Sequence, residues 1–247
     1  MPTPLLTFSI ALSLALASMA FFALRGSRPD ADAQGKGAQF ALGAGNFLVH
    51  WFMWVLRPVD WLAFRLGLSP DFFNFAGLAC GLASGILIGL GRLELGGWAI
   101  VAGGVCDIMD GRVARASKVD SKYGKFIDST LDRFVEVFAL LGFVVFLRAT
   151  PYGAFCAAAA MAGSLLVSYA RARGESLGVL CKEGLMQRAE RLVLTILICW
   201  LDRTLSGWWG LAVGTPSTWV LGAIAVGTFG TAAQRTAWIS RRLREQA

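Results

Sequence analysis

Long apolar stretches recur along the sequence and constrain the fold more than any other feature. Of the 247 residues, 56% are hydrophobic and only 16% are charged, whereas an average soluble domain has about 25% charged residues. Each stretch has about 20 mostly apolar residues, which is enough to cross a hydrocarbon core of about 30 Å as a helix. The sequence therefore predicts an all-α integral membrane protein.

Six core spans are expected, within one transmembrane domain at 68–240 that is followed by a basic tail at 241–247. The first span takes about 20 residues after Leu68, and the other five are expected at 95–116, 124–147, 152–173, 185–205 and 216–239. Ser69 and Pro70 are typical of a helix start. Glycines then recur every four residues and form a ridge on one helix face that allows close packing. These are Gly77, Gly81, Gly85 and Gly89.

Three further segments precede this domain. Residues 1–25 are apolar, with Arg25 at the end of the run, and are predicted to form a membrane anchor with its N-terminus outside; a cleaved or disordered leader is the alternative. Residues 26–45 lack periodicity and are predicted to form a flexible linker. Residues 46–67 combine aromatic side chains with Arg57 and Asp60, which favours an amphipathic helix lying in the membrane interface.

The charge distribution predicts the topology. The net charge is +7, and the most basic connections (112–125, 171–191 and the tail) all fall on one side of the predicted bundle. By the positive-inside rule this side is cytoplasmic, and a basic excess of this kind indicates anionic lipid headgroups rather than nucleic acid. We expect a protein of the bacterial cytoplasmic membrane whose active site faces the cytoplasm.

Four aspartates fall within one stretch of 26 residues, in two otherwise membrane-like segments. Asp107 and Asp110 are three residues apart, and Asp128 and Asp132 are four apart. Residues at these spacings share one helix face, with Cβ atoms about 5 to 6 Å apart. Two antiparallel helices could therefore bring all four carboxylates together.

Such a cluster needs cations, because carboxylates at membrane depth are costly and repel one another. Oxygen ligands favour Mg²⁺ or Mn²⁺ over zinc, since the only histidine, His50, is far away in the sequence. Four carboxylates could hold two ions about 3.5 to 4 Å apart, as in phosphoryl transfer. Gly111 leaves room for a ligand, and Arg112 and Arg115 offer forked donors to phosphate oxygens. An intramembrane salt-bridge network and a cation-transport site are the alternatives.

This segment resembles the motif of a known family. The pattern D-x2-D-G-x2-A-R-x8-G-x3-D-x3-D is that of the CDP-alcohol phosphotransferases, also called phosphatidyltransferases, and every defined position is present from Asp107 to Asp132. The similarity extends in weaker form over about 68–239. One departure is Pro70-Asp71, where many relatives have Pro-Asn.

The resemblance implies a divalent metal site with two Mg²⁺ or Mn²⁺ ions. Asp107, Asp110 and Asp128 would be metal ligands. Asp132 would be a ligand of the second metal and the candidate base for the attacking hydroxyl, so that Asp128 and Asp132 form the catalytic pair. The CDP moiety would be contacted by Gly111, Ala114, Arg115 and Gly124.

A second polar cluster contains several basic residues, namely Arg171, Arg173, Lys182, Arg188 and Arg191. They can be interpreted as ordinary positively charged cytoplasmic flanks. The other interpretation is a pocket for the phosphate of an acceptor, because more arginines converge here than topology requires. The segment is also similar to the acceptor side of phosphatidylinositol-phosphate synthases and some phosphatidylglycerophosphate synthases.

The leading hypothesis is an enzyme of phospholipid biosynthesis. It would transfer a phosphatidyl group from CDP-diacylglycerol to a phosphorylated polyol, inositol phosphate ahead of glycerol phosphate, and release CMP. Transfer from CDP-choline or CDP-ethanolamine to diacylglycerol is the alternative within the family, and a metal-ion carrier or an inactive interaction protein is the alternative outside it. The expected partners are the CDP-linked lipid donor, the polyol phosphate, membrane lipids and a second copy in a homodimer.

Overall fold

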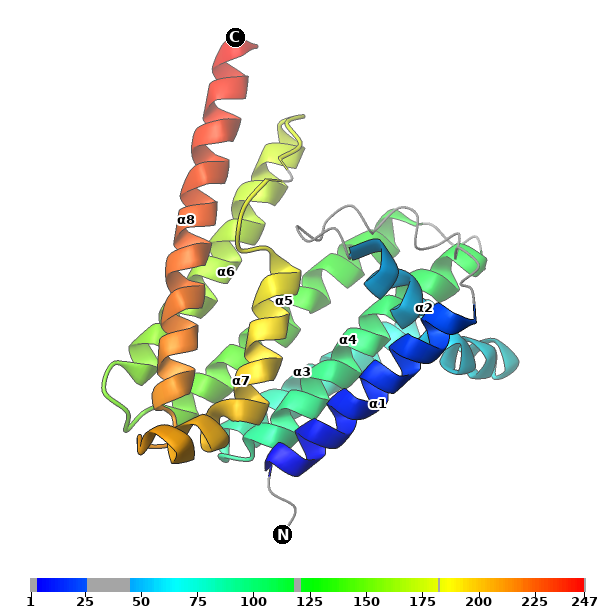
Figure 1. The fold of residues 1–247 in the computed structure, drawn as a ribbon. Coiled ribbons are helices and arrows are strands. Elements are labelled where there is room, and N and C mark those ends of the chain that lie inside the picture. The colour runs from blue at the N-terminus through cyan, green and yellow to red at the C-terminus, as the bar shows by residue number, and fades with distance from the viewer. Residues whose placement is uncertain (1–3, 26–44, 118–120, 182, 247) are drawn as a thin grey trace. The chain divides into compact units, whose positions relative to one another are not determined.

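The chain is helical throughout the part that the structure describes. The computed structural model describes residues 4–25, 45–117, 121–181 and 183–246, and every regular element in these ranges is an α-helix. The helices are α1 (Pro4–Leu24), α2 (Gly45–Arg65), α3 (Pro70–Gly89), α4 (Leu93–Ala116), α5 (Lys122–Phe146), α6 (Gly153–Ser176), α7 (Arg188–Trp209) and α8 (Thr215–Glu245) (Figure 1). The predicted all-α class is confirmed. Residues 26–44, most of the predicted linker, lie outside the described residues.

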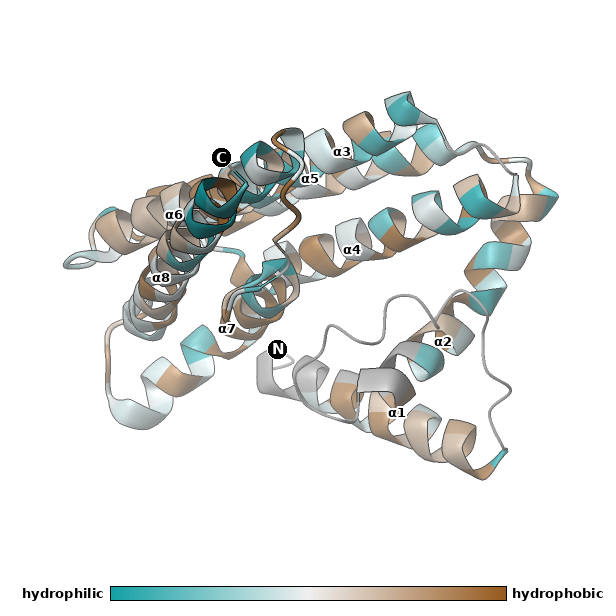
Figure 2. Cartoon of the chain, turned by 90° about the horizontal axis from the view of Figure 1, so that it is seen from above, coloured by the Kyte–Doolittle hydropathy of each residue, from teal (hydrophilic) through white to brown (hydrophobic). Residues whose placement is uncertain are grey.

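Several helix boundaries differ from those predicted, and two of the differences matter most. Helix α7 begins at Arg188 rather than at Leu185, because the backbone of Gln187 is extended, with φ −83° and ψ −179°. Helix α8 continues to Glu245 rather than ending at Ile239. Most of the predicted basic tail is therefore helical, and it forms the hydrophilic end of α8 in Figure 2.

Among the described residues, two helices, α3 and α6, are long and apolar enough to cross a membrane, judged by length and composition. The other four predicted core spans, α4, α5, α7 and α8, each carry several charged residues. Those charges include the motif aspartates and the arginines of the second cluster. Hydropathy alone therefore supports two of the six predicted spans.

The chain divides into two compact units. The first contains Met1–Phe75 and Cys106–Asp128, and the second contains Ala76–Val105 and Ser129–Ala247. The division passes through α3, α4 and α5, so that each of these helices contributes residues to both units.

In the first unit, α2 has one buried face and one exposed apolar face. Its buried residues are Met53, Leu56, Asp60 and Ala63, at helical spacing, while Trp61, Leu62 and Phe64 are exposed. The helix ends in a Schellman turn, in which the amide of Leu68 donates to the carbonyl of Ala63 and Gly67 has a φ of 62°. The Ser69 hydroxyl then accepts a hydrogen bond from the Phe72 amide at the start of α3, as the sequence predicts.

In the second unit, the glycine ridge of α3 packs against α5. A Cβ atom on Gly85 would lie 2.3 Å from the carbonyl oxygen of Phe138, and one on Gly81 would lie 2.8 Å from Val135. A Cβ atom on Gly142 of α5 would in turn lie 2.4 Å from the carbonyl oxygen of Gly85. Only glycine allows the two backbones to approach this closely, so the predicted ridge is a helix contact inside the protomer.

The rest of the second unit packs around a core of apolar side chains that includes Ile88, Phe143, Leu147, Ile198 and Leu221. Helices α6 and α8 run side by side (Figure 1). Helix α8 begins at a cap provided by another helix: Asp202 of α7 accepts hydrogen bonds from the amides of Gly214 and Ser217, both at 2.9 Å. The carboxylate thus satisfies amides that the first turn of α8 leaves without helical partners.

Candidate metal and anion sites

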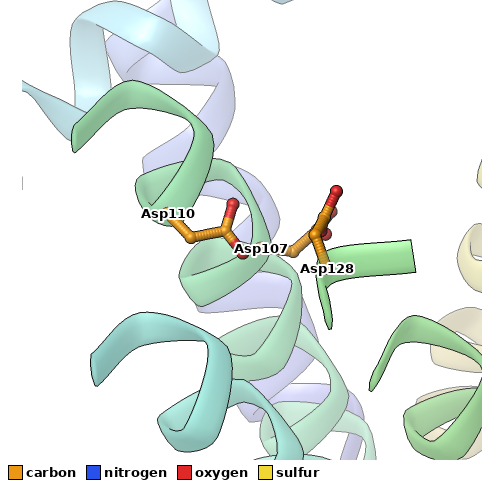
Figure 3. Close-up of side chains that lie close together, drawn as sticks. All are labelled: Asp107, Asp110 and Asp128. Atoms are coloured by element: carbon orange, nitrogen blue, oxygen red, sulfur yellow. The ribbon is translucent and has the colours of Figure 1, made fainter. Parts of the chain in front are cut away.

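Three of the four motif aspartates meet in the first unit. One carboxylate oxygen each from Asp107, Asp110 and Asp128 lies within 4.8 Å of the other two (Figure 3). Asp110 is buried, and the other two are partly exposed. Oxygens that share one small divalent cation lie about 3 to 4 Å apart, since each metal–oxygen distance is about 2.1 Å. The three side chains are therefore close to the spacing that one Mg²⁺ or Mn²⁺ requires.

Local sequence explains the placement of these carboxylates. The spacing of Asp107 and Asp110 directs both from one face of α4, in agreement with the helical prediction. Helix α5 begins at Lys122, and the Ser121 hydroxyl accepts a hydrogen bond from the amide of Gly124 at 2.9 Å. This N-cap sets the start of the helix that carries Asp128.

The guanidinium of Arg112 pairs with a carboxylate of the protein, contrary to the expectation that it donates to a phosphate. Its Nε and Nη2 donate to the two carboxylate oxygens of Asp60 on α2, over 2.8 and 2.5 Å, and its Nη1 lies 2.8 Å from the sulfur of Met53. Both side chains of the ion pair are 10% exposed. The physical reason is that Asp60 is the residue of α2 whose buried charge needs a partner, and a bidentate arginine supplies one.

Arg115 lies over Gly111. A Cβ atom added to Gly111 would meet Nη1 of Arg115 at 3.2 Å, while the space beside Gly124 is bounded by the Ser121 hydroxyl at 3.3 Å. Ala114 is partly exposed on the same helix. The absence of a side chain at Gly111 therefore leaves room for the guanidinium of Arg115, which as a whole residue is exposed.

Asp132 follows Asp128 by four residues on α5 and belongs to the second unit. Its two carboxylate oxygens accept from Nη2 and Nη1 of Arg188, each over 2.6 Å. The Asp132 side chain is 15% exposed and that of Arg188 is 37% exposed. The fourth predicted ligand is thus paired with one of the predicted acceptor arginines.

Arg191 is the most deeply buried of the predicted acceptor arginines that the structure describes. It donates to both carboxylate oxygens of Glu136 and to the carbonyl of Met186. Helix α5 thus supplies a carboxylate to Arg188 and another to Arg191. The number of arginines in this cluster therefore does not by itself require an acceptor anion.

A small cavity of about 30 Å³ lies beside these two ion pairs. Asp132, Glu136, Arg188 and Arg191 line it together with apolar residues such as Leu140 and Ile224. Ser164 also lines it, and the Ser164 hydroxyl is buried without a hydrogen-bond partner. The cavity therefore has room for about one or two water molecules between the ion pairs and the apolar side chains.

The remaining members of the basic cluster differ in their surroundings. Arg171 donates to Glu175 one turn away on α6, at 2.8 Å, and both side chains are well exposed. Arg173 is exposed near the end of the same helix. Lys182 lies outside the described residues.

Glu136 and Asp60 are site residues that the sequence analysis missed. Asp132 and Glu136 are four residues apart and Arg188 and Arg191 are three apart, so each pair lies on one face of its helix. That match was a usable signal. Asp60 had only the weaker signal of a lone carboxylate on an apolar helix.

Comparison with known proteins supports the interpretation of the motif. Residues 67–233 match the CDP-alcohol phosphatidyltransferase family. The chain is 34% identical over 206 residues to a phosphatidylinositol phosphate synthase of Streptomyces avermitilis, covering 78% of this chain and 81% of that protein. It is 34% identical over 143 residues to an archaetidylinositol phosphate synthase of Methanothermobacter thermautotrophicus, covering 58% and 71%.

The fold is also similar to a solved structure. The crystal structure of a Mycobacterium tuberculosis phosphatidylinositol phosphate synthase with CDP-DAG bound superposes with a TM-score of 0.64 at 22% identity, covering 74% of this chain and 92% of that one. The match by sequence includes Asp107 to Asp132 and spans most of the chain. On this evidence the chain is an enzyme that belongs to the CDP-alcohol phosphatidyltransferase family.

Proposed function

We propose that the enzyme transfers a phosphatidyl group from CDP-diacylglycerol to a phosphorylated polyol, with inositol phosphate as the preferred acceptor, and releases CMP. The observation that carries this proposal is the convergence of the Asp107, Asp110 and Asp128 carboxylates inside the family motif. The named relatives that make phosphatidylinositol phosphate and archaetidylinositol phosphate support the choice of acceptor.

In the proposed reaction, the acceptor hydroxyl oxygen forms a bond to the phosphorus on the lipid side of the diphosphate. The bond from that phosphorus to the bridging oxygen breaks, and CMP leaves with its electron pair. Asp132 accepts the proton of the attacking hydroxyl. The motif residues Gly111, Ala114, Arg115 and Gly124 contact the CDP moiety, because small residues and one forked cation suit a flat base and a phosphate.

The carboxylates Asp107, Asp110 and Asp128 would hold Mg²⁺ or Mn²⁺, two ions per site when Asp132 joins them. The oxygen-only donor set and its 4.8 Å spacing fit these ions. Bound cations would neutralise the diphosphate and stabilise negative charge on the transferred group. A relative in this fold has been crystallised in complex with manganese and citrate, which supports the choice of metal.

For the acceptor phosphate, we assign direct contact to Arg188 and Arg173, with Arg171 and Lys182 as helpers. Arg188 is 37% exposed beside the cavity and Arg173 is exposed near the end of α6. We assign Arg191 an indirect role, in which it holds the start of α7 in place, because its guanidinium is buried and donates to Glu136 and to the carbonyl of Met186.

The proposed enzyme lies in the bacterial cytoplasmic membrane as a homodimer with six core spans and its active site on the cytoplasmic side. The segments 1–25, 26–45, 46–67, 68–240 and 241–247 then act as anchor, linker, interfacial helix, catalytic domain and basic tail. The exposed apolar residues Trp61, Leu62 and Phe64 support a location of α2 at the membrane.

The test measures CMP release by purified enzyme in lipid nanodiscs with CDP-diacylglycerol and Mn²⁺. Inositol phosphate, glycerol 3-phosphate and free inositol are compared as acceptors, and CDP-choline with diacylglycerol is the alternative donor arm. The proposal expects CMP with inositol phosphate and a loss of CMP in excess chelator. CMP formed faster with free inositol, or only from CDP-choline, would contradict it.

A further inference from the structure

Helices α1 and α2 precede the region that matches the family, yet they belong to the same compact unit as the three motif carboxylates. From their contacts we infer that this helix pair supports the metal site, and that Asp60 is a positioning residue that acts through Arg112. The inference rests on the proposed function, because it concerns how the carboxylates of that site are held.

The first layer of contacts joins α1 to α2. Phe22 of α1 is 5% exposed, and its ring packs against Trp54 and Phe47 of α2 with centroid distances of 5.6 and 5.7 Å. The indole Nε1 of Trp51 donates to the hydroxyl of Ser18 at 3.0 Å. These contacts bury Phe22, and the directional hydrogen bond to Ser18 restrains the rotation of α2 about its axis.

The second layer joins α2 to the motif. Met53 and Asp60 lie on the buried face of α2, and both contact the guanidinium of Arg112. The two parallel hydrogen bonds to Asp60 fix the orientation of the guanidinium plane as well as its position. Arg112 therefore has a defined place relative to α2, although 52 residues separate it from Asp60.

The third layer is the motif turn itself. Arg112 follows Asp110 by two residues. Met109, directly before Asp110, and Val113, directly after Arg112, are buried, with exposures of 0% and 2%. The two buried side chains and the hydrogen bonds of Arg112 to Asp60 restrain the rotation of this helical turn. Through Arg112, α2 therefore helps to fix the direction of the Asp110 carboxylate. Partners outside the ligand set commonly tune metal affinity in this way.

The ion pair between Asp60 and Arg112 also neutralises the positive charge of Arg112 close to the metal site. Asp60 and Arg112 are each 10% exposed and opposite in sign, so they balance one another. Without Asp60, the Arg112 guanidinium would lose that partner within the helical turn that carries Asp110. A cation released there would compete with a metal ion for the carboxylates, and metal affinity would fall.

The experiment measures the binding of Mn²⁺ to the full-length protein by electron paramagnetic resonance, so that no substrate turnover is needed. Asp60→Asn should raise the dissociation constant for Mn²⁺ about tenfold, the lower end of the effect of outer partners. Asp60→Glu keeps the charge and should recover most of the affinity. The thermal unfolding midpoint of each variant in the absence of metal is measured in parallel.

Phe22→Ala provides a second test that changes no charge and lies far in sequence from the carboxylates. It should also raise the Mn²⁺ dissociation constant, whereas Leu14→Ala, at a residue of the same helix that is 65% exposed, should leave it unchanged. Wild-type affinity in both Asp60→Asn and Phe22→Ala would overturn the inference. Failure of the wild-type protein to bind Mn²⁺ would instead contradict the proposed function.

Discussion

Arg191 donates hydrogen bonds to both carboxylate oxygens of Glu136, over 2.6 and 2.9 Å, and so ties the start of α7 to the middle of α5. The arginine side chain is 4% exposed and the glutamate side chain is 18% exposed. In a pair with so little solvent contact, removal of one partner leaves the other charge poorly solvated. The pair therefore makes the acceptor side of the second unit sensitive to single substitutions.

Glu136→Gln should lower the free energy of unfolding by about 3 kcal/mol, because it leaves the Arg191 charge buried without a counter-charge. Chemical denaturation in detergent, followed by tryptophan fluorescence, measures the change. The control is Glu175→Gln, which breaks the exposed pair with Arg171 and should cost less than about 1 kcal/mol. Equal losses in the two variants would show that burial of the Glu136 pair has no special importance.

Asp110→Asn should reduce CMP release at least about 100-fold and weaken CDP binding as well. The ligand organises both the metal and the diphosphate, so its loss should exceed the 10- to 100-fold effect of an outer partner. Asp132→Asn should reduce turnover while sparing CDP affinity, since the proton acceptor is lost but the three-carboxylate cluster remains. Initial rates and binding of CDP by calorimetry separate the two effects. Identical loss of CDP affinity in both variants would argue against distinct roles.

Arg188→Ala should raise the KM for inositol phosphate by about 10- to 100-fold and change the KM for CDP-diacylglycerol little. A hydrogen bond to a charged group contributes about 1.5 to 3 kcal/mol, and this loss appears in ground-state binding when turnover is spared. Arg188→Lys should recover only part of the affinity, because an ammonium group lacks the guanidinium fork. Unchanged acceptor kinetics in Arg188→Ala would assign this arginine to the Asp132 ion pair alone.

Gly85→Ala should destabilise the protein by about 1 to 3 kcal/mol, the usual cost of overpacking. Its new methyl group would lie 2.3 Å from the backbone carbonyl of Phe138, which cannot move aside as a side chain could. Gly207→Ala is the matched control, since no atom lies within 4 Å of the added Cβ and alanine is the better helix former. A stable Gly85→Ala variant would mean that α3 and α5 can separate without penalty.

The parts of the fold that follow from local patterns could be predicted from sequence. The cap at Ser69, the glycine ridge from Gly81 to Gly89, and the shared face of Asp107 and Asp110 all depend on spacing within one helix. Spacing within one helix is read directly from the order of residues. Apart from the C-terminal end of α8, the ends of the predicted core spans therefore lie within about four residues of the observed helix ends.

The partners of the buried arginines could not be predicted in the same way. Arg112 meets Asp60 across 52 residues, and Arg191 meets Glu136 across 55. Such pairs depend on the rotation and crossing of two helices, and several carboxylates were available to each arginine by sequence alone. The expectation that Arg112 would bind phosphate failed because α2 supplies a buried carboxylate that the pattern did not assign to any partner.

The close contact between Gly85 of α3 and Gly142 of α5 also has a consequence for the order in which the two helices enter the membrane. Helix α3 is apolar enough to enter a membrane as soon as it leaves the ribosome, whereas α5 carries several charges in its first half. The contact forms only after Gly142 has been added, some 57 residues after Gly85. In the proposed membrane setting, α3 would therefore already lie in the lipid when α5 is synthesised. Packing of Gly142 against Gly85 would then help to keep α5, the more polar helix, in the bilayer.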